Sequence, residues 1–320
     1  MSNNIMSEEI WLIGAGQMAS DYAKVLKELS YDFTVIGRSE KSAKEFEYKT
    51  GVSVVQGGLE NAISSASYVP KYAIVAVNVE HLAHITTLLI KYGVKNILVE
   101  KPAGLEYQEI KNLCEFAVKN NISVFIAYNR HFYASVIRAK EIIEDDGGVV
   151  SFNFEFTEWS HIIEKFQKPR EVFENWFLTN STHVVDLAFY LGGYPTKISC
   201  YTSGSTDWYE RASVFCGAGV TDIGALFSYQ ANWKGPGRWG VEFITPKHRL
   251  ILRPMEKLQI QHIGSVITEF VDIDDEMEKE FKPGLYLQIR DFIENRIDSR
   301  FVSIQQHCKN IKIYQSIENI

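Results

Sequence analysis

The sequence predicts an α/β fold, in which an N-terminal doubly wound parallel sheet is followed by an α+β domain with an open, mostly antiparallel sheet. Short, continuously apolar runs alternate with helical patterns over residues 1–127. A glycine-rich turn follows the first of these runs, and the hydrophobic period changes to two after about residue 128. Strands that are apolar throughout are buried on both faces, which is typical of parallel sheets covered by crossover helices.

In residues 1–127, expected strands and expected helices follow one another, as crossover connections between parallel strands require. The strands are expected at Ile10–Ile13, Asp32–Ile36, Ser53–Val55, Tyr72–Val77, Asn96–Val99 and Ser123–Ala127. The helices are expected at Met18–Leu29, Ser39–Thr50, Leu59–Ser65, Val79–Lys91 and Tyr107–Lys119.

Residues 128–320 begin with an expected helix at Ala134–Glu144. The strands that follow have no intervening helical pattern and alternate apolar with polar residues, which favours an antiparallel sheet with one covered face. They are expected at Val149–Thr157, Lys197–Thr202, Arg211–Cys216, Ile223–Trp233, Trp239–Thr245 and Arg249–Arg253, and helices at Gly284–Asn295 and Ile304–Ser316 close the chain.

Composition argues against several classes of protein. Hydrophobic residues make up 46% of the 320 residues and charged residues 23%, the balance of a globular protein. The formal net charge of −7 disfavours nucleic acid as a partner. The four cysteines are far apart with no CxxC, so we expect reduced thiols and no metal. The acidic Met1–Glu9 does not resemble a signal peptide, and no run approaches the roughly 18 apolar residues of a membrane helix, so we expect a cytoplasmic protein without membrane contact.

The turn at Gly14–Ala19 has the sequence G-A-G-Q-M-A, a G-x-G-x-x-A variant of the Rossmann dinucleotide-binding fingerprint. Gly14 permits the tight turn, Gly16 lets the backbone approach a pyrophosphate, and Ala19 lets the helix lie against the strand. Free N–H groups at the helix start favour phosphate. The alternative is a glycine turn without a ligand. We expect a nicotinamide dinucleotide to contact Gly14, Ala15, Gly16, Gln17 and Met18.

The second strand ends in Gly37-Arg38-Ser39, about 20 residues after the fingerprint. An NAD site normally has an acidic residue there to accept the ribose hydroxyls, and none is present at these three positions. The planar guanidinium of Arg38 suits a phosphate dianion, and Lys41 adds a second charge. We therefore expect NADP(H) to be favoured over NAD(H). The alternative is that Arg38 is a solvated side chain at a strand end.

Four features, in order along the chain, resemble the Gfo/Idh/MocA oxidoreductase family, which includes glucose–fructose oxidoreductase and inositol dehydrogenase. They are the turn at Gly14–Ala19, Glu100-Lys101-Pro102 after the fifth strand, Tyr128-Asn129-Arg130 at the crossover between domains, and His183 with Asp186 at the start of a helix. The resemblance covers essentially the whole chain, and E-K-P is its most specific motif.

The resemblance implies hydride transfer between nicotinamide and a hydroxyl or carbonyl carbon of a sugar or sugar derivative, including nucleotide-activated sugars, bound between the two domains. It implies that Lys101 hydrogen-bonds the reacting oxygen and that His183 handles the proton. Oxidation of a carbinol needs a partner for the hydroxyl proton, and histidine titrates near neutral pH. Family structures often have this Lys-Pro bond cis, so we expect a cis Lys101–Pro102 bond.

One position departs from the family pattern. The family commonly has an aspartate four residues before the histidine, where this sequence has Thr179, which cannot take up a proton near neutral pH. Three explanations stay open: His183 works with Lys101 alone, Asn180 helps to position the substrate, or the chemistry is altered. Asp186, one turn after His183, is expected either to orient the histidine or to cap nearby backbone.

The remaining candidates each have a structural alternative. Asn78 and His81 either contact the cofactor ribose or cap the following helix. Arg130 either binds substrate or supports the crossover, and most tryptophans are packing residues. With these alternatives open, further cofactor contacts are expected from Gly37, Arg38, Ser39, Asn78, His81, Glu100 and Lys101, and substrate contacts from Lys101, Tyr128, Arg130, Trp159, Asn180 and His183.

Two other functions stay open. Thr179 favours a cofactor-binding regulatory protein that has lost turnover, and the fold also suits a reductase of a non-sugar substrate, as in biliverdin reductase, which resembles this family. We expect residues 1–127 to bind NAD(P) and residues 128–320 to bind substrate and mediate oligomerisation. The open sheet has an outer face to cover, so pairing into a homo-oligomer, a dimer or tetramer, is expected.

Overall fold

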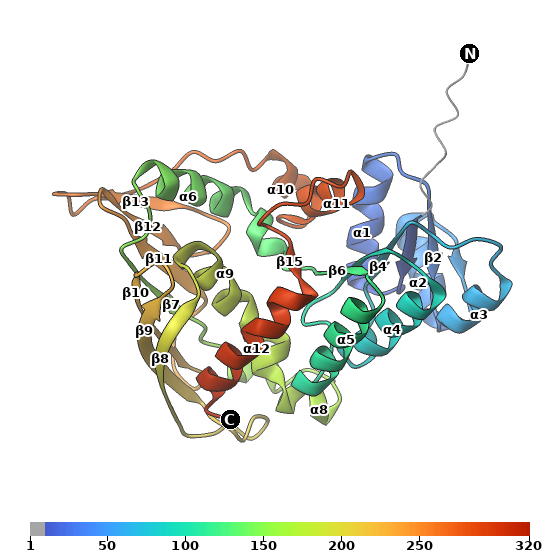
Figure 1. The fold of residues 1–320 in the computed structure, drawn as a ribbon, viewed down its shortest axis with the longest axis horizontal. Coiled ribbons are helices and arrows are strands. Elements are labelled where there is room, and N and C mark those ends of the chain that lie inside the picture. Colours follow the sequence, from blue (N-terminus) through green and yellow to red (C-terminus); the bar gives the residue numbers. More distant parts are fainter. Residues whose placement is uncertain (1–9) are drawn as a thin grey trace, which may run out of the picture. The chain divides into compact units, whose positions relative to one another are not determined.

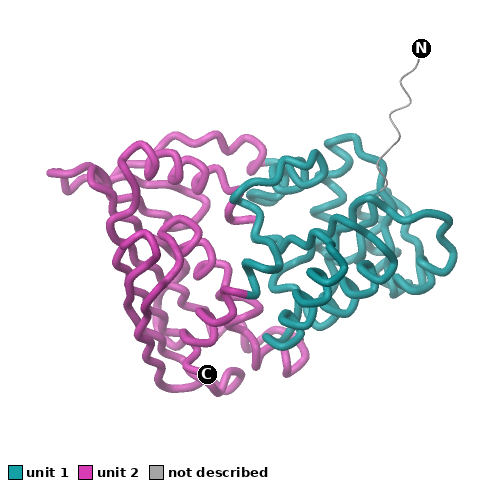
Figure 2. Tube along the Cα trace, viewed as in Figure 1, with its two compact units in different colours: residues 1–128, 280–308 teal, residues 129–279, 309–320 magenta. Residues whose placement is uncertain are grey.

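The computed structural model describes residues 10–320, which fold into two compact units (Figure 2). Unit 1 contains the chain up to Tyr128 together with Glu280–Cys308, and unit 2 contains Asn129–Lys279 and Lys309–Ile320. The chain therefore crosses over close to the expected boundary, but it also returns to unit 1 for a segment that we expected in the second domain. The signal-peptide expectation concerns Met1–Glu9 and lies outside the described residues.

Sheet A of unit 1 has the strand order β15-β6-β5-β4-β1-β2-β3. All of its neighbouring strands are parallel except β15, which pairs antiparallel with β6. This confirms the Rossmann-type parallel sheet, and β1 lies at the point where the strand order reverses. The strands are β1 (Ile10–Ile13), β2 (Phe33–Ile36), β3 (Val54–Val55), β4 (Tyr72–Val75), β5 (Asn96–Val99), β6 (Ser123–Ile126) and β15 (Val302–Ser303).

The helices of unit 1 form two contacting sets: α1 contacts α2 and α11, and α4 contacts α3 and α5 (Figure 1). Helix α1 buries Tyr22, Val25 and Leu26, whose spacing places them on one face. A short 3₁₀ turn, η1 (Val79–His81), precedes α4 where we expected one continuous helix. The helices are α1 (Gln17–Glu28), α2 (Glu40–Thr50), α3 (Gly58–Ser65), α4 (Leu82–Tyr92), α5 (Tyr107–Lys119) and α11 (Leu285–Ile293).

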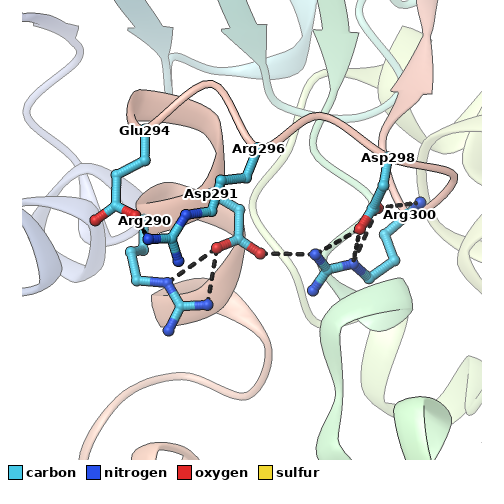
Figure 3. Close-up of polar contacts among 6 residues, drawn as sticks. All are labelled: Arg290, Asp291, Glu294, Arg296, Asp298 and Arg300. Carbon is cyan, nitrogen blue, oxygen red and sulfur yellow. Dashed lines mark hydrogen bonds and ion pairs between the residues drawn. The ribbon is translucent and has the colours of Figure 1, made fainter.

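A charged cluster stabilises the turn between α11 and β15, inside the segment Glu280–Cys308 that returns to unit 1 (Figure 3). The carboxylate of Asp291, whose side chain is 2% exposed, lies 2.8 Å from Nη2 of Arg290 and 2.7 Å from Nη2 of Arg300. Arg300 also contacts Asp298 at 2.7 Å. Since each oxygen of the buried carboxylate has a charged donor, its loss of hydration is compensated and the turn is fixed.

Sheet B of unit 2 has the order β14-β13-β12-β11-β7-β10-β9-β8. All neighbouring strands of sheet B pair antiparallel, except that β7 and β10 are parallel to each other. This confirms the expected mostly antiparallel sheet. The strands are β7 (Ser151–Glu155), β8 (Pro195–Ser203), β9 (Val214–Thr221), β10 (Leu226–Asn232), β11 (Gly240–Ile244), β12 (His248–Leu252), β13 (Gln259–His262) and β14 (Thr268–Phe270).

Aromatic rings form much of the core on the covered face of sheet B. Phe152 of β7 stacks on Phe227 of β10 at 5.4 Å, and Phe189 of α9 meets Phe227 edge-on at 5.1 Å. Burial alternates along β10, so its intervening side chains are exposed. The other helical elements outside unit 1's two helix sets are η2 (Asn129–Phe132), α6 (Ala134–Asp145), α7 (Ser160–Ile163), α8 (Arg170–Glu174), η3 (Phe177–Ser181), α9 (Thr182–Gly192), α10 (Glu276–Glu280) and α12 (Ile304–Glu318). The expectation that no helical pattern separates the strands of the second sheet is therefore wrong between β7 and β8, where α7, α8, η3 and α9 intervene.

Within residues 10–320, no helix combines the length and the apolar character that crossing a bilayer requires. The same part of the chain contains no group of three or more histidine, cysteine or acidic side chains placed to hold a metal ion.

Candidate functional site

A cavity of about 300 Å³ lies at the carboxyl ends of β1, β2 and β4 in unit 1. This is the edge at which open α/β sheets bind their ligands, beside the point where strand order reverses. The structure brings many of the predicted cofactor residues to this one cavity, namely Gly14, Ala15, Gly16, Arg38, Ser39, Asn78 and His81.

The glycine turn leaves the space that a pyrophosphate needs. Gly14 has φ +126°, and a Cβ there would lie 2.2 Å from the carbonyl oxygen of Ala76, so the turn requires glycine. A Cβ on Gly16 would meet nothing within 4 Å. Gly16 also precedes α1, whose first turn has no acidic residue. Open space at the positive end of a helix fits a dinucleotide phosphate.

Arg38 and His81 lie side by side at the cavity. Nη1 of the exposed Arg38 is 3.3 Å from Nε2 of His81. Ser39 precedes α2, and its Oγ accepts a long 3.5 Å hydrogen bond from the backbone N–H of Ser42. Ser39 thus caps a helix and also lines the cavity.

Glu60 is a cavity residue that sequence reasoning missed. It lies in the first turn of α3, and its Oε1 is 3.5 Å from Nε2 of His84. The backbone N–H of Gly58 donates to the carbonyl of Gly37 at 3.0 Å, which ties the start of α3 to the end of β2. Tertiary contacts of this kind bring the carboxylate to the cavity, so no local sequence pattern reveals it.

Three further predicted cofactor residues do not line this cavity. The side chain of Gln17 donates to Asp21 at 3.0 Å, and Nζ of Lys282 lies 2.7 Å from the sulfur of Met18. Gly37 packs under the turn, because a Cβ there would lie 2.8 Å from a methyl group of Val54. Gln17, Met18 and Gly37 therefore contact other parts of the protein and not the cavity.

The Glu100-Lys101-Pro102 motif follows β5. Tyr22 of α1 donates a 2.7 Å hydrogen bond to Oε1 of Glu100. Burial raises the pKa of the Glu100 carboxyl, against the opposing effects of this hydrogen bond and of the charge on Lys101. The Lys101–Pro102 bond is cis, as expected, and the Pro102 carbonyl lies 3.0 Å from Nε2 of His307. Glu100 and Lys101 also do not line the cavity.

His183, the second residue of α9, is a buried residue of unit 2 with 8% exposure. Its ring centroid lies 6.1 Å from that of Trp239. Thr179 lies within η3, which is a π-helical turn. Because a π turn contains more residues than an α turn, the four-residue interval from Thr179 to His183 is not a regular α-helical repeat.

Glu158 is the second acidic residue that sequence reasoning missed. Its side chain is 2% exposed and lies 3.5 Å from Nη1 of Arg238. Oε1 of Glu158 accepts hydrogen bonds from Asn180 at 2.9 Å and from Ser181 at 2.7 Å. A buried carboxylate therefore stabilises the segment that leads into the His183 helix. It comes from the loop after β7, far away in the sequence.

Asp186 contacts a different histidine from the one that we considered. Its Oδ2 lies 2.7 Å from Nε2 of His131, and the ring of Tyr190 stacks on His131 at 3.9 Å. Its Oδ1 accepts hydrogen bonds from Asn310 and Tyr314, both at 3.3 Å. These contacts place Asp186 in a buried structural network.

Residues 9–128 match the model of a family described as an oxidoreductase family with an NAD-binding Rossmann fold, GFO_IDH_MocA. The predicted resemblance to the Gfo/Idh/MocA family is confirmed. The matched segment ends at Tyr128, which is also where the first part of unit 1 ends. The match concerns the Rossmann domain, residues 9–128, and not the rest of the chain. No curated protein matches the chain.

Solved structures similar to the chain extend over nearly its whole length. UDP-N-acetylglucosamine 3-dehydrogenase GnnA from Acidithiobacillus ferrooxidans is 13% identical, with a TM-score of 0.74, and the match covers 97% of this chain and 96% of GnnA. An NAD binding oxidoreductase from Klebsiella pneumoniae is 14% identical, with a TM-score of 0.77 and the same coverage of 97% and 96%. Levoglucosan dehydrogenase in complex with NADH and levoglucosan is 17% identical, with a TM-score of 0.76, covering 97% and 96%. At these identities the likeness shows the fold.

Two further predicted substrate residues differ in their exposure. Tyr128 is 1% exposed, and its ring packs 5.7 Å from His307. Trp159 is 45% exposed, and its indole N–H donates to the carbonyl of Gly237 at 2.8 Å. Trp159 therefore presents a surface that a ligand can reach, whereas Tyr128 is a core residue of unit 1.

Proposed function

We propose that this protein belongs to the Gfo/Idh/MocA family and is an NAD(P)-dependent dehydrogenase or reductase that acts on a CH–OH or carbonyl group of a sugar or sugar derivative. The observation that carries the proposal is the cavity at Gly14–Gly16, where the backbone leaves open space at the start of α1. Bound there, the nicotinamide cofactor supplies or accepts the hydride.

We propose NADP(H) as the preferred cofactor. Arg38 is the second residue after β2, at the position where a side chain reads the ribose, and its guanidinium is exposed at the cavity. A guanidinium binds a phosphate dianion through parallel hydrogen bonds. Glu60 lines the same cavity, but it approaches from α3 and faces His84. Arg38 is therefore the residue that we assign to the 2′-phosphate.

Lys101 and His183 are the residues that we propose to handle the proton. Lys101 hydrogen-bonds the reacting oxygen, and His183 gives or takes its proton, since a carbinol loses a proton as well as a hydride. Asn180, held by Glu158, positions the substrate in place of the carboxylate that Thr179 lacks. This arrangement needs no proton transfer at Thr179.

Two observations support a sugar substrate and an oligomer. The similar structures include levoglucosan dehydrogenase and UDP-N-acetylglucosamine 3-dehydrogenase, which are named for carbohydrate substrates. Sheet B exposes Tyr201 at 69% and Leu226 at 62%. Exposed apolar side chains on an open sheet suit pairing with a second copy, so we propose a homo-oligomer formed through sheet B.

The test is hydride transfer, followed by the absorbance of reduced nicotinamide against a panel of sugars. We expect turnover by the unmutated protein and a loss of at least about 100-fold in Lys101→Ala, since general acid–base groups contribute that much or more. Cofactor binding with no turnover of any sugar would favour the regulatory function that Thr179 suggests. Turnover of a non-sugar carbonyl or tetrapyrrole, with no turnover of any sugar, would favour a reductase of a non-sugar substrate.

A further inference from the structure

One indole in unit 2 connects two guanidinium groups to His183. The ring of Trp239 lies 4.9 Å from Cζ of Arg130 and 4.6 Å from Cζ of Arg238. The His183 ring centroid is 6.1 Å from that of Trp239. Two positive charges are thus held on one aromatic side chain, beside the histidine that we propose handles the proton.

Two buried donor atoms of this group have no acceptor in the described part of the chain. Nε1 of Trp239 and Nε of Arg130 are buried, and within residues 10–320 neither has a hydrogen-bond partner. Trp239 is 7% exposed. Burial lowers the pKa of Arg130, and no carboxylate in the described chain forms an ion pair with it. Buried donors without acceptors are uncommon, and a missing ion or ligand is a standard physical explanation.

The acidic side chains nearby do not form an ion pair with Arg130. Glu158 and Glu256 are the acidic residues whose charges act on Arg130. Glu158 uses Oε1 for Asn180 and Ser181, and its Oε2 is 3.5 Å from Arg238. The cluster is therefore rich in donors and short of acceptors.

Arg238 gives this cluster an accessible side. Its side chain is 47% exposed, and its guanidinium also lies 4.8 Å from the ring of Trp159, which is 45% exposed. The planar guanidinium fork matches the geometry of carboxylate and phosphate oxygens. An anionic group at this place would supply the acceptors that Arg130 and Trp239 lack.

We propose that Arg130, Arg238 and Trp239 bind an anionic group of the substrate, which is therefore a sugar carrying a carboxylate or a phosphate and not a neutral sugar. This inference rests on the proposed function and narrows its substrate class. Sugar acids and sugar phosphates both present a group of anionic oxygens to these residues. The experiment tests the two kinds of sugar separately.

The experiment measures binding by titration calorimetry and turnover by hydride transfer, both in the presence of NADP(H). The probes are the neutral, uronic acid and 6-phosphate forms of glucose, galactose and mannose. We expect at least one charged form to bind about tenfold or more tightly than its neutral counterpart, with binding that weakens as salt is raised. Equal binding of charged and neutral forms, or binding of none, would overturn the inference.

Variants locate the charged contact. Arg238→Gln is expected to lose about tenfold or more in affinity for the charged sugar and little for the neutral one. The matched control is Arg249→Gln, because Arg249 is 48% exposed and lies 3.4 Å from Glu242, much as Arg238 lies near Glu158. Arg130→Lys keeps the charge without the fork and is expected to restore only part of the affinity lost in Arg130→Met. If Arg130→Met does not fold, Arg238→Gln still decides.

The two measurements separate the two proposals. Binding of a charged sugar that depends on Arg238, without hydride transfer, would keep this inference and overturn the proposed enzymatic function. Turnover of neutral sugars that equals that of charged ones, unchanged in Arg238→Gln, would keep the enzyme and overturn this inference.

Discussion

The side-chain amide of Asn180 donates a 2.9 Å hydrogen bond to Oε1 of Glu158, which joins the segment before the His183 helix to the loop after β7. We predict that Glu158→Ala lowers kcat about tenfold or more, because Asn180 and Ser181 lose a charged acceptor. The substrate for this comparison is the one that the unmutated enzyme turns over best. Steady-state kinetics measures this. Glu158→Gln, which keeps an acceptor oxygen, should recover part of the loss. An unchanged kcat in Glu158→Ala would show that this carboxylate does not position the site.

Arg38 is predicted to determine the cofactor preference. Arg38→Asp should weaken NADPH binding about tenfold to 100-fold and leave NADH binding nearly unchanged, because it replaces a phosphate-binding guanidinium with a carboxylate that repels the phosphate. Fluorescence titration with both reduced cofactors measures the two affinities. Equal weakening of NADPH and NADH would mean that Arg38 does not contact the 2′-phosphate.

The Tyr22–Glu100 hydrogen bond is predicted to make stability depend on pH. Tyr22→Phe should lower the free energy of unfolding by about 1–3 kcal/mol at pH 7, because a buried carboxylate loses its donor. The pKa of Glu100 is raised on folding, so the folded state binds more protons than the unfolded state above about pH 4, and the contribution of Glu100 to stability falls as pH rises. The difference between Tyr22→Phe and the unmutated protein should therefore grow from pH 4 to pH 7. Urea denaturation at several pH values measures it, and a difference independent of pH would contradict this account.

The charged cluster shown in Figure 3 supplies a matched pair of stability variants. Asp291→Ala should cost about 3 kcal/mol, because it removes the buried partner of both Arg290 and Arg300. Glu294→Ala should cost less than about 1 kcal/mol, since Glu294 pairs with the largely exposed Arg296. Chemical denaturation compares the two. Equal losses would show that burial of Asp291 does not determine the strength of this cluster.

The parts of the fold that could be predicted from sequence are those set by local pattern. The two central strands of sheet A, β1 and β4, are fully buried and read as unbroken apolar runs. Strand β15 has two residues and β14 has three exposed ones, so neither carries a periodic signal. The return of the chain to unit 1 depends on pairing between β15 and β6, which are far apart in sequence.

The residues of the candidate site also fall into those that a local sequence pattern predicts and those that depend on contacts between distant segments. Gly14, Gly16 and Arg38 were predictable cavity residues, because a short motif with a fixed backbone geometry identifies them. The same motif also suggested Gln17 and Met18, which do not line the cavity. Glu60 and Glu158 were not predictable, since each comes to its place through contacts between distant segments. Asp186 was considered beside His183 because of their sequence spacing, whereas folding placed its carboxylate against His131.

Binding of a dinucleotide at the glycine turn is the central claim, and titration of the protein with NADPH and NADH tests it most directly. We predict saturable binding with a dissociation constant of roughly 1 μM to 1 mM, the range in which enzymes commonly bind substrates. Gly16→Val should abolish this binding while the protein stays folded, because a side chain there would occupy the open space at the start of α1. No association of either cofactor with the unmutated protein at millimolar concentration, or full binding by Gly16→Val, would contradict the account.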